Sequence, residues 1–177
     1  ETLQNEIPQT AHIINTSGHC ASYTAQMNTH PHSHYTVIRD FGAIGNGTSF
    51  ALGIAERYRD RPVILLDGDG SVMMHIQELE TMARHKLNIM TVVLNDGGYG
   101  SEVHKLRSLG GTLAGSVFGR PDFASVGRGF GLAGTTAITQ DDIAHAVRSF
   151  LNTGGPAICD VHISDTFASP QIQRNKY

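Results

Sequence analysis

Two apolar segments that each run into an acidic turn constrain the fold of this chain more than any other feature. Residues 63–66, Val-Ile-Leu-Leu, lead into Gly68-Asp69-Gly70-Ser71, and residues 89–94 lead into Asn95-Asp96. Between them, apolar residues recur at helical spacing, which predicts a helix with one buried face: Val72, Ile76, Leu79 and Ala83. This order predicts two parallel strands whose carboxyl ends bring Asp69 and Asp96 to one edge of a sheet. Ligands of open α/β sheets bind at that edge.

Asp69 and Asp96 offer hard oxygen ligands beside the start of a helix. Such an arrangement suits Mg²⁺ carrying a diphosphate, because the cation binds the carboxylates and the free N–H groups of the helix bind the phosphate. The alternative is an acidic turn that binds nothing. Two such turns at matching strand ends favour a binding site over that alternative.

Gly68-Asp69-Gly70, followed one strand later by Asn95-Asp96, resembles the signature of thiamine diphosphate (ThDP) enzymes, which ends in Asn-Asn. Residues 11–163 resemble the C-terminal, diphosphate-binding domain of the acetolactate synthase and 2-oxo acid decarboxylase group. The resemblance implies that Asp69 and Asp96 bind Mg²⁺ through their side chains and Gly98 through its backbone carbonyl. Aspartate in place of asparagine at position 96 keeps an oxygen ligand and adds a negative charge.

A glycine-bearing turn over residues 40–48 is the second motif, and its glycines allow a ligand to approach the backbone. In the family the matching turn holds the aminopyrimidine ring. The resemblance implies that the Gly42 carbonyl accepts a hydrogen bond from the cofactor's amino group. It also implies that Ile44 separates the two rings and imposes the bent shape of the cofactor. An isoleucine of the hydrophobic core is the alternative interpretation for Ile44.

A third candidate segment, residues 16–20, follows the first predicted strand. A helix start with hydroxyl groups and a glycine can hold phosphate oxygens, and in the family this segment contacts the diphosphate. We therefore include Ser17 and His19 among the cofactor-binding candidates, with a helix cap and an exposed histidine as the equal alternative. Ser71 is a similar case, because its hydroxyl can bind phosphate or cap its helix. Gly68 and Gly70 complete the set of cofactor-binding candidates.

His30, His32 and His34 alternate along a polar connection, so an extended segment would point all three to one side. They predict either a zinc site or a substrate-facing cluster, and the alternative is a polar loop without a ligand. His75 and His104 are further candidates, for which a core or surface position is the ordinary interpretation.

Alternating strands and helices predict an α/β fold with a doubly wound, mostly parallel sheet and helices on both faces. We expect a single domain over residues 1–177, with residues 1–10 and 164–177 as extended termini. A long loop or lid is expected over residues 97–119. The expected strands cover residues 11–15, 36–39, 63–66, 89–94 and 156–163, and further helices are expected at residues 17–26, around 50–55, 122–130 and 140–151.

Composition is that of an ordinary enzyme domain, with 40% hydrophobic residues and a net charge of −3. The 13 Lys and Arg residues are scattered, so no nucleic-acid partner is expected. No apolar run reaches membrane-spanning length. The two cysteines lie far apart in the sequence, which favours a reducing compartment, and we expect the cytoplasm.

The family's activating glutamate, which contacts the pyrimidine ring, comes from a separate pyrimidine-binding domain, so we expect no catalytic residue within this chain. The chain would be either one subunit of a hetero-oligomer, such as a dimer of heterodimers, or a fragment of a longer chain that forms a homo-oligomer. The substrate would be a 2-oxo acid, and either protonation or carboligation would follow decarboxylation. Residues 70–75 resemble the short phosphonopyruvate decarboxylases, whereas residues 121–124 and 129–132 resemble acetolactate synthases.

Two other functions are considered. A strand over residues 36–39, then Gly45-Asn46-Gly47, a helix, and a strand ending at Asp67 imitate the NAD(P)-binding unit of a dehydrogenase. Phe50 stands at the third glycine position, however, and that interpretation gives Asp69 and Asp96 no role. A non-catalytic subunit that kept the ThDP fold is the other alternative.

Overall fold

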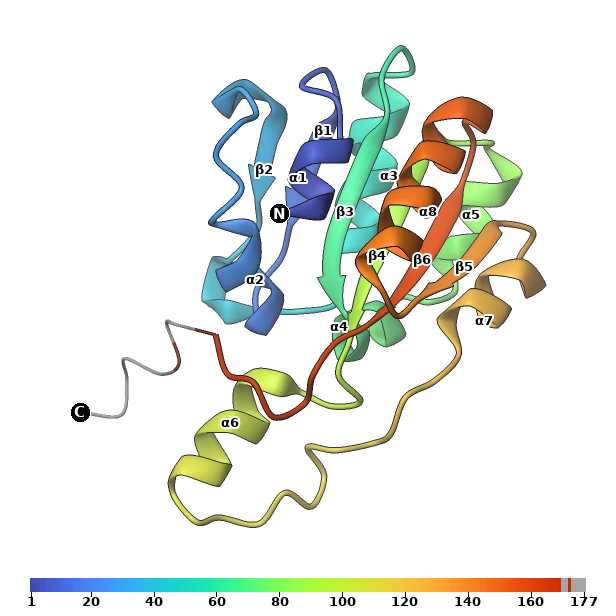
Figure 1. The fold of residues 1–177 in the computed structure, drawn as a ribbon. Helices are drawn as coiled ribbons and strands as arrows, with labels where there is room; N and C mark the ends of the chain where they lie inside the picture. The colour runs from blue at the N-terminus through green and yellow to red at the C-terminus, as the bar shows by residue number, and fades with distance from the viewer. Residues whose placement is uncertain (170–171, 173–177) are drawn as a thin grey trace.

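The computed structural model describes residues 1–169 and 172, and within them six parallel strands form one sheet in the order β2-β1-β3-β4-β6-β5. Figure 1 shows the strands running side by side with their carboxyl ends toward α4 and α6. The strands are β1 (His12–Asn15), β2 (Tyr35–Val37), β3 (Val63–Gly68), β4 (Ile89–Asn95), β5 (Ala133–Ala137) and β6 (Ala157–His162). The predicted parallel α/β fold is confirmed.

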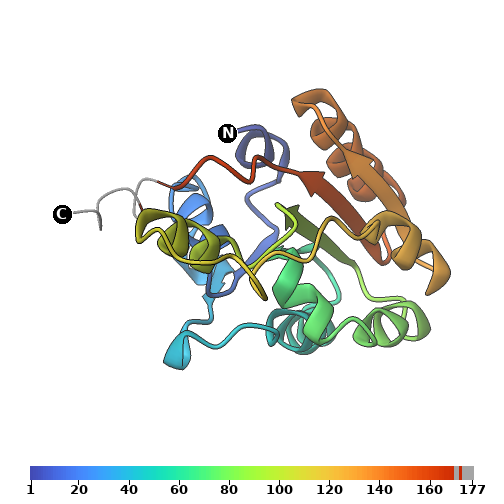
Figure 2. The same cartoon turned by 90° about the horizontal axis from the view of Figure 1, so that it is seen from below.

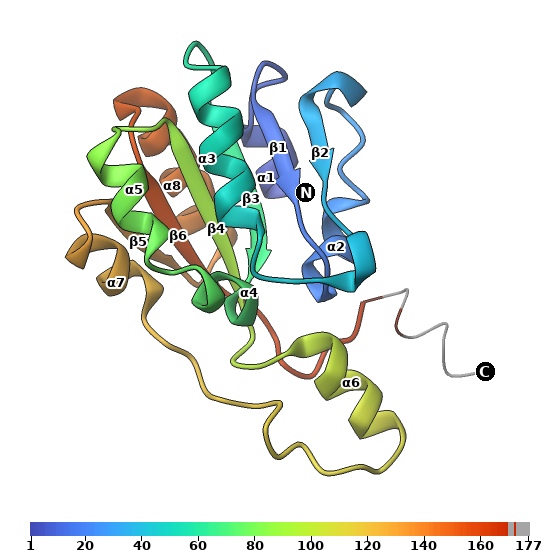
Figure 3. The ribbon, with the colours of Figure 1, turned by 180° about the vertical axis from the view of Figure 1, so that it is seen from behind.

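Alternation along the central strands divides the core between the two faces of the sheet. Val63 and Leu65 belong to one buried cluster, whereas Ile64 and Leu66 belong to the other. α3, α4, α5 and α7 cover the first face, and α1 and α8 cover the second (Figures 2 and 3). The helices are α1 (Thr2–Glu6), α2 (His19–Thr24), α3 (Gly47–Arg57), α4 (Asp69–Met74), α5 (Glu78–Arg84), α6 (Gly100–Ser108), α7 (Phe123–Gly129) and α8 (Gln140–Thr153).

The helix predicted after the Gly-Asp-Gly turn is broken into α4 and α5. Three successive N–H groups, those of Glu78, Leu79 and Glu80, donate to carbonyls three residues earlier, at 3.0–3.2 Å. This tighter winding interrupts the α-helix. The apolar spacing survives the break, because Val72 and Leu79 are both buried in the same cluster.

Three other expectations about secondary structure were wrong. Residues 1–10 are not wholly extended, because they contain the helix α1, which packs against α8. The expected loop over residues 97–119 contains α6, and the chain has an additional strand, β5, at the edge of the sheet. Residues 164–169 form no helix or strand, and the remainder of the expected C-terminal tail, apart from residue 172, lies outside the described residues.

The strand order creates an opening at the carboxyl edge of the sheet. From β1 the chain moves outward to β2, then returns across β1 to form β3 on its other side. Connections that leave a parallel sheet in opposite directions open a crevice between the two strands concerned. α6 lies beyond this edge, away from both helical layers (Figure 1). Among the described residues, no helix is both long and apolar enough to cross a bilayer.

Candidate functional site

A cleft of about 560 Å³ lies at the carboxyl edge, where β1, β3 and β4 end. Every residue that the sequence predicts to bind cofactor or metal lines it. These residues are Ser17, His19, Gly42, Ile44, Gly68, Asp69, Gly70, Ser71, Asp96 and Gly98. The fold thus brings together four segments that are far apart in the sequence.

Asp69 begins α4 at the end of β3 and is buried, with 2% of its surface exposed. Its Oδ1 accepts from the Gly70 N–H at 2.8 Å, and its Oδ2 accepts from the N–H groups of Gly97 and Gly98 at 2.8 and 3.2 Å. These bonds join the two acidic turns. Burial, and then repulsion from Asp96, raise the pKa of Asp69 to about 7 despite the three donors.

Asp96 faces His19, whose Nδ1 lies 3.6 Å from the Asp96 Oδ2. The His19 Nε2 accepts from the Ser169 N–H at 2.9 Å, so in the neutral ring the proton is on Nδ1. That Nδ1–H is buried and has no hydrogen-bond partner. An unpaired buried donor is costly. His19 is therefore set to donate to a ligand oxygen beside Asp96.

The two serines that the sequence predicts for the site are already hydrogen-bonded. Ser17 donates to the Ile38 carbonyl at 3.4 Å. Ser71 donates to Asp67 Oδ2 and accepts from the Gly45 N–H, both at 2.8 Å. The Ser71 hydroxyl thus has no proton left for a phosphate oxygen while these bonds hold.

Several lining residues were not predicted. The Tyr99 ring packs over Gly70, where an added Cβ would lie 2.6 Å from it. Gly100 begins α6 against the Asp96 carboxylate, and no side chain fits between them. Glu102 and Lys105, paired at 3.3 Å, line the cleft from α6. Gly100 could have been predicted, because it is a glycine next to a ligand-bearing turn. Nothing in the sequence predicts that the polar residues of α6 line the cleft. The other lining residues that were not predicted are Gly18, Cys20, Ala21, Arg39, Leu94, Ser101 and Ile163.

Cys20 lines the cleft but does not resemble a nucleophile. Its side chain is buried, and that burial together with the charge of Asp67 raises the pKa of the thiol to about 12. A thiol of that pKa stays protonated and unreactive near neutral pH.

The histidines of the 28–35 connection do not gather into a site. His30 is buried with its ring edge-on to Tyr35, and His32 is exposed. His34 donates through Nδ1 to the Gln9 carbonyl at 2.8 Å and accepts from Arg61 at 3.1 Å. Within the described part of the chain, no three His, Cys, Asp or Glu side chains could share a metal ion. The structure therefore supports neither the zinc site nor the substrate-facing cluster.

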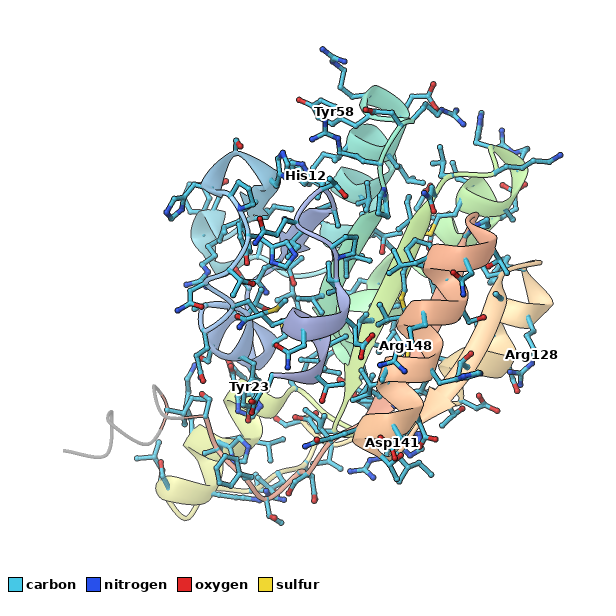
Figure 4. All side chains as sticks on the ribbon, turned by 45° about the horizontal axis from the view of Figure 1, so that its top comes forward. His12, Tyr23, Tyr58, Arg128, Asp141 and Arg148 are labelled. Carbon is cyan, nitrogen blue, oxygen red and sulfur yellow. The ribbon has the colours of Figure 1, made fainter. Side chains whose placement is uncertain are left out.

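The remaining histidines also lie outside the cleft lining. His75 bonds to Ser49 at 2.9 Å between their side chains. His104 is buried in α6 with its ring 4.9 Å from that of His19, and burial lowers its pKa. Figure 4 shows His12 and Tyr58, whose rings stack at 6.0 Å, at the opposite end of the sheet from Tyr23, the neighbour of His19.

Asp67, the ribose-binding acid of the dehydrogenase alternative, cannot hold a ribose. It is fully buried, and its two oxygens accept from Thr16, the Gly68 N–H and Ser71. Its pKa is raised to about 6 by burial. That alternative was wrong for this chain.

Comparison with known proteins agrees with this geometry. Residues 16–161 match the family described as thiamine pyrophosphate enzyme, C-terminal TPP binding domain. The chain is 33% identical over 125 residues to acetolactate synthase isozyme 1 large subunit of Escherichia coli, covering 69% of this chain and 22% of that protein. It is 32% identical over 168 residues to phosphonopyruvate decarboxylase of Streptomyces viridochromogenes, covering 93% and 38%.

Among solved structures, a thiamine diphosphate-dependent 4-hydroxybenzoylformate decarboxylase of Rhodococcus jostii RHA1 superimposes with a TM-score of 0.83 at 28% identity. The match covers 92% of this chain and 31% of that one. The chain thus spans only 22–38% of the length of these three proteins. The two acidic turns, the cleft between them and the match over residues 16–161 lead to one conclusion: this chain belongs to the thiamine diphosphate enzyme family and contains its C-terminal cofactor-binding domain.

Proposed function

We propose that this domain binds ThDP through Mg²⁺ and serves an enzyme that decarboxylates a 2-oxo acid. Asp69 and Asp96 hold the cation in this proposal, together with the Gly98 backbone carbonyl. The cofactor itself would supply the electron sink for breaking the carbon–carbon bond. The residues of this chain bind, orient and shield it.

The observation that carries the proposal is the pairing of two buried carboxylates with an unpaired donor. Burial, and then repulsion from Asp96, raise the pKa of Asp69, so a divalent cation bound between the two carboxylates would offset both the lost hydration and the repulsion. The His19 Nδ1–H next to them lacks an acceptor. A cation with an attached anionic group satisfies both needs, which supports a metal–diphosphate ligand.

The glycine-bearing turn over residues 40–48 supports the second half of the assignment. Gly42 and the half-buried Ile44 line the same cleft as the acidic turns. In the proposed complex the Gly42 carbonyl accepts a hydrogen bond from the pyrimidine's amino group, and Ile44 separates the two rings. Gly68, Gly70 and Ser17 lie where the diphosphate would approach the backbone.

Phe41 supports the proposal that a second protein domain lies next to this turn. Phe41 is fully exposed and has a left-handed backbone, with φ 56°. An exposed phenylalanine with a left-handed backbone costs free energy, and a covering surface would reduce that cost. The partner we propose is the pyrimidine-binding domain, with its activating glutamate, from another subunit or another segment of a longer chain.

The relatives divide between a synthase and decarboxylases, so the proposal leaves protonation and carboligation as the two possible ends of the reaction. Cys20 and Cys159 are both buried free thiols. They fit a reducing compartment, and we propose the cytoplasm.

Calorimetric titration of this chain with ThDP, with and without Mg²⁺, tests the proposal. We expect binding that depends on Mg²⁺ and is abolished by EDTA and by Asp69→Ala. Asp60→Asn is the control, because Asp60 is exposed and outside the cleft lining. Its affinity should equal that of the unmodified chain.

Binding of ThDP that is unaffected by EDTA would refute the metal assignment. If ThDP fails to bind even after a pyrimidine-binding domain from a relative is added, the non-catalytic alternative replaces the proposal.

A further inference from the structure

A chain of buried hydrogen bonds connects Asp67 to the turn that carries Gly42 and Ile44. The Asp67 Oδ2 accepts from the Ser71 hydroxyl at 2.8 Å, and the Ser71 Oγ accepts from the Gly45 N–H at 2.8 Å. Asp67 is fully buried, Ser71 is 4% exposed, and Gly45 is buried. The chain thus runs from the end of β3, through α4, to the backbone one residue after Ile44.

Asp67 is itself fixed by other donors. Its Oδ1 accepts from the Thr16 hydroxyl, at the end of β1, and from the Gly68 N–H at 2.8 Å. One carboxylate therefore connects β1, β3 and α4. Its bonds from the Thr16 and Ser71 hydroxyls are buried, and losing a partner there is costly.

Across the residues that the structure describes, the Gly45 N–H makes the one backbone-amide hydrogen bond from residues 40–46 to another element. Among the described residues, the other backbone hydrogen bonds from the amides of residues 40–46 are local, such as Gly42 N–H to the Arg39 carbonyl and Ala43 N–H to the Asp40 carbonyl. Gly45 has φ 91°, and a Cβ there would lie 2.8 Å from Met74 of α4. The turn can therefore sit this close to α4 only with glycine at this position, and the Ser71 hydroxyl supplies its hydrogen bond to that helix.

We propose that Asp67 is a positioning residue that acts through Ser71 to hold the Gly45 amide, and so sets where Ile44 and Gly42 meet the rings of the cofactor. On this assignment Ser71 anchors the turn and does not bind phosphate. The part that concerns the cofactor rests on the proposed function. The anchoring of Gly45 does not.

Amide hydrogen exchange measured by NMR on the metal-free chain tests the anchor directly. Ser71→Ala should accelerate exchange of the Gly45 amide by about fivefold or more, the effect of losing one net hydrogen bond. Exchange of the β3 amides should not change, which shows an intact fold. Ser49→Ala is the matched control, because Ser49 also bonds to a neighbouring element, at 2.9 Å to His75, but not to the turn.

A pair of ligands then tests positioning. With Mg²⁺ present, Ser71→Ala and Asp67→Asn should each weaken binding of ThDP by about fivefold relative to binding of inorganic pyrophosphate, which has no rings to place. Equal weakening of both ligands would make Ser71 a phosphate contact and overturn the proposal. So would an unchanged exchange rate at Gly45 in Ser71→Ala. If the unmodified chain binds neither ligand, the proposed function fails, while the exchange measurement still decides whether Ser71 anchors the turn.

Discussion

Replacing Asp69 with asparagine should remove much of the pH dependence of stability of the metal-free chain. Burial and repulsion from Asp96 raise the pKa of Asp69 from 3.8 to about 7 in the folded state. The folded chain therefore holds this proton more tightly than the unfolded chain. The resulting stabilisation is complete below about pH 4 and is lost as the pH rises through about 7.

The size of the effect follows from the two pKa values. The gap between 3.8 and about 7 corresponds to about 4 kcal/mol in the free energy of unfolding, which is an upper limit. Asp67 adds a smaller contribution of the same sign, because its pKa is raised to about 6, equivalent to about 3 kcal/mol. Asp69→Asn should therefore reduce the dependence of stability on pH by about half, because Asp67 still titrates.

Urea unfolding in EDTA at about pH 4 and about pH 8 measures this difference. The unmodified chain should lose more stability between the two pH values than Asp69→Asn does. Adding Mg²⁺ with pyrophosphate at the higher pH should stabilise the unmodified chain more than Asp69→Asn, because the asparagine keeps an oxygen ligand but loses the negative charge. Equal losses in the two proteins would refute the reasoning, because Asp69 would then titrate alike in the folded and unfolded states.

Two further predictions concern other residues of the described chain. Gly100→Ala should weaken Mg²⁺-dependent pyrophosphate binding by about tenfold, because the added Cβ would meet the Asp96 carboxylate. Gly53→Ala, with open space around its Cβ in α3, is the control and should bind normally in the same titration. The second prediction concerns the two thiols. Burial raises the pKa of both Cys20 and Cys159 from 9.0 to about 12. Alkylation near neutral pH should therefore be about a thousandfold slower in the folded chain than in denaturant. Mass spectrometry of iodoacetamide-treated chain follows that rate, and similar rates in both states would contradict the burial argument.

The cleft was predictable because its parts follow strands with a strong apolar pattern. Residues 63–66 and 89–94 are apolar runs typical of strands buried inside a parallel sheet, and the side chains after such strands converge at one edge. Asp69 and Asp96 were therefore placed together correctly from spacing and resemblance. β5 was not predicted because Ala133–Ala137 is an edge strand that, among the described residues, pairs with β6 alone. Just one of its five residues is buried, so the strand shows no apolar alternation.

α6 was missed for a related reason. Only Val103 and His104 of this helix are buried, so it carries almost no apolar face. The orientation of the His19 ring could not be predicted from the neighbouring residues in the sequence either. Its tautomer depends on the Ser169 N–H, 150 residues away in the sequence, and no pattern within residues 16–20 encodes that contact.

The segment that carries α6 leaves and rejoins the domain at almost the same place. The Tyr99 N–H donates to the Ser116 carbonyl at 2.8 Å, the Phe118 N–H donates to the Gly97 carbonyl at 3.0 Å, and Gly98 and Val117 form a bridge. A loop closed at its base transmits little of a change at its tip, and doubling its length costs only about 0.6 kcal/mol in closure entropy. The part of this segment that lies beyond α6 can therefore be lengthened at small entropic cost, while the hydrogen bonds at its base keep the second acidic turn in place.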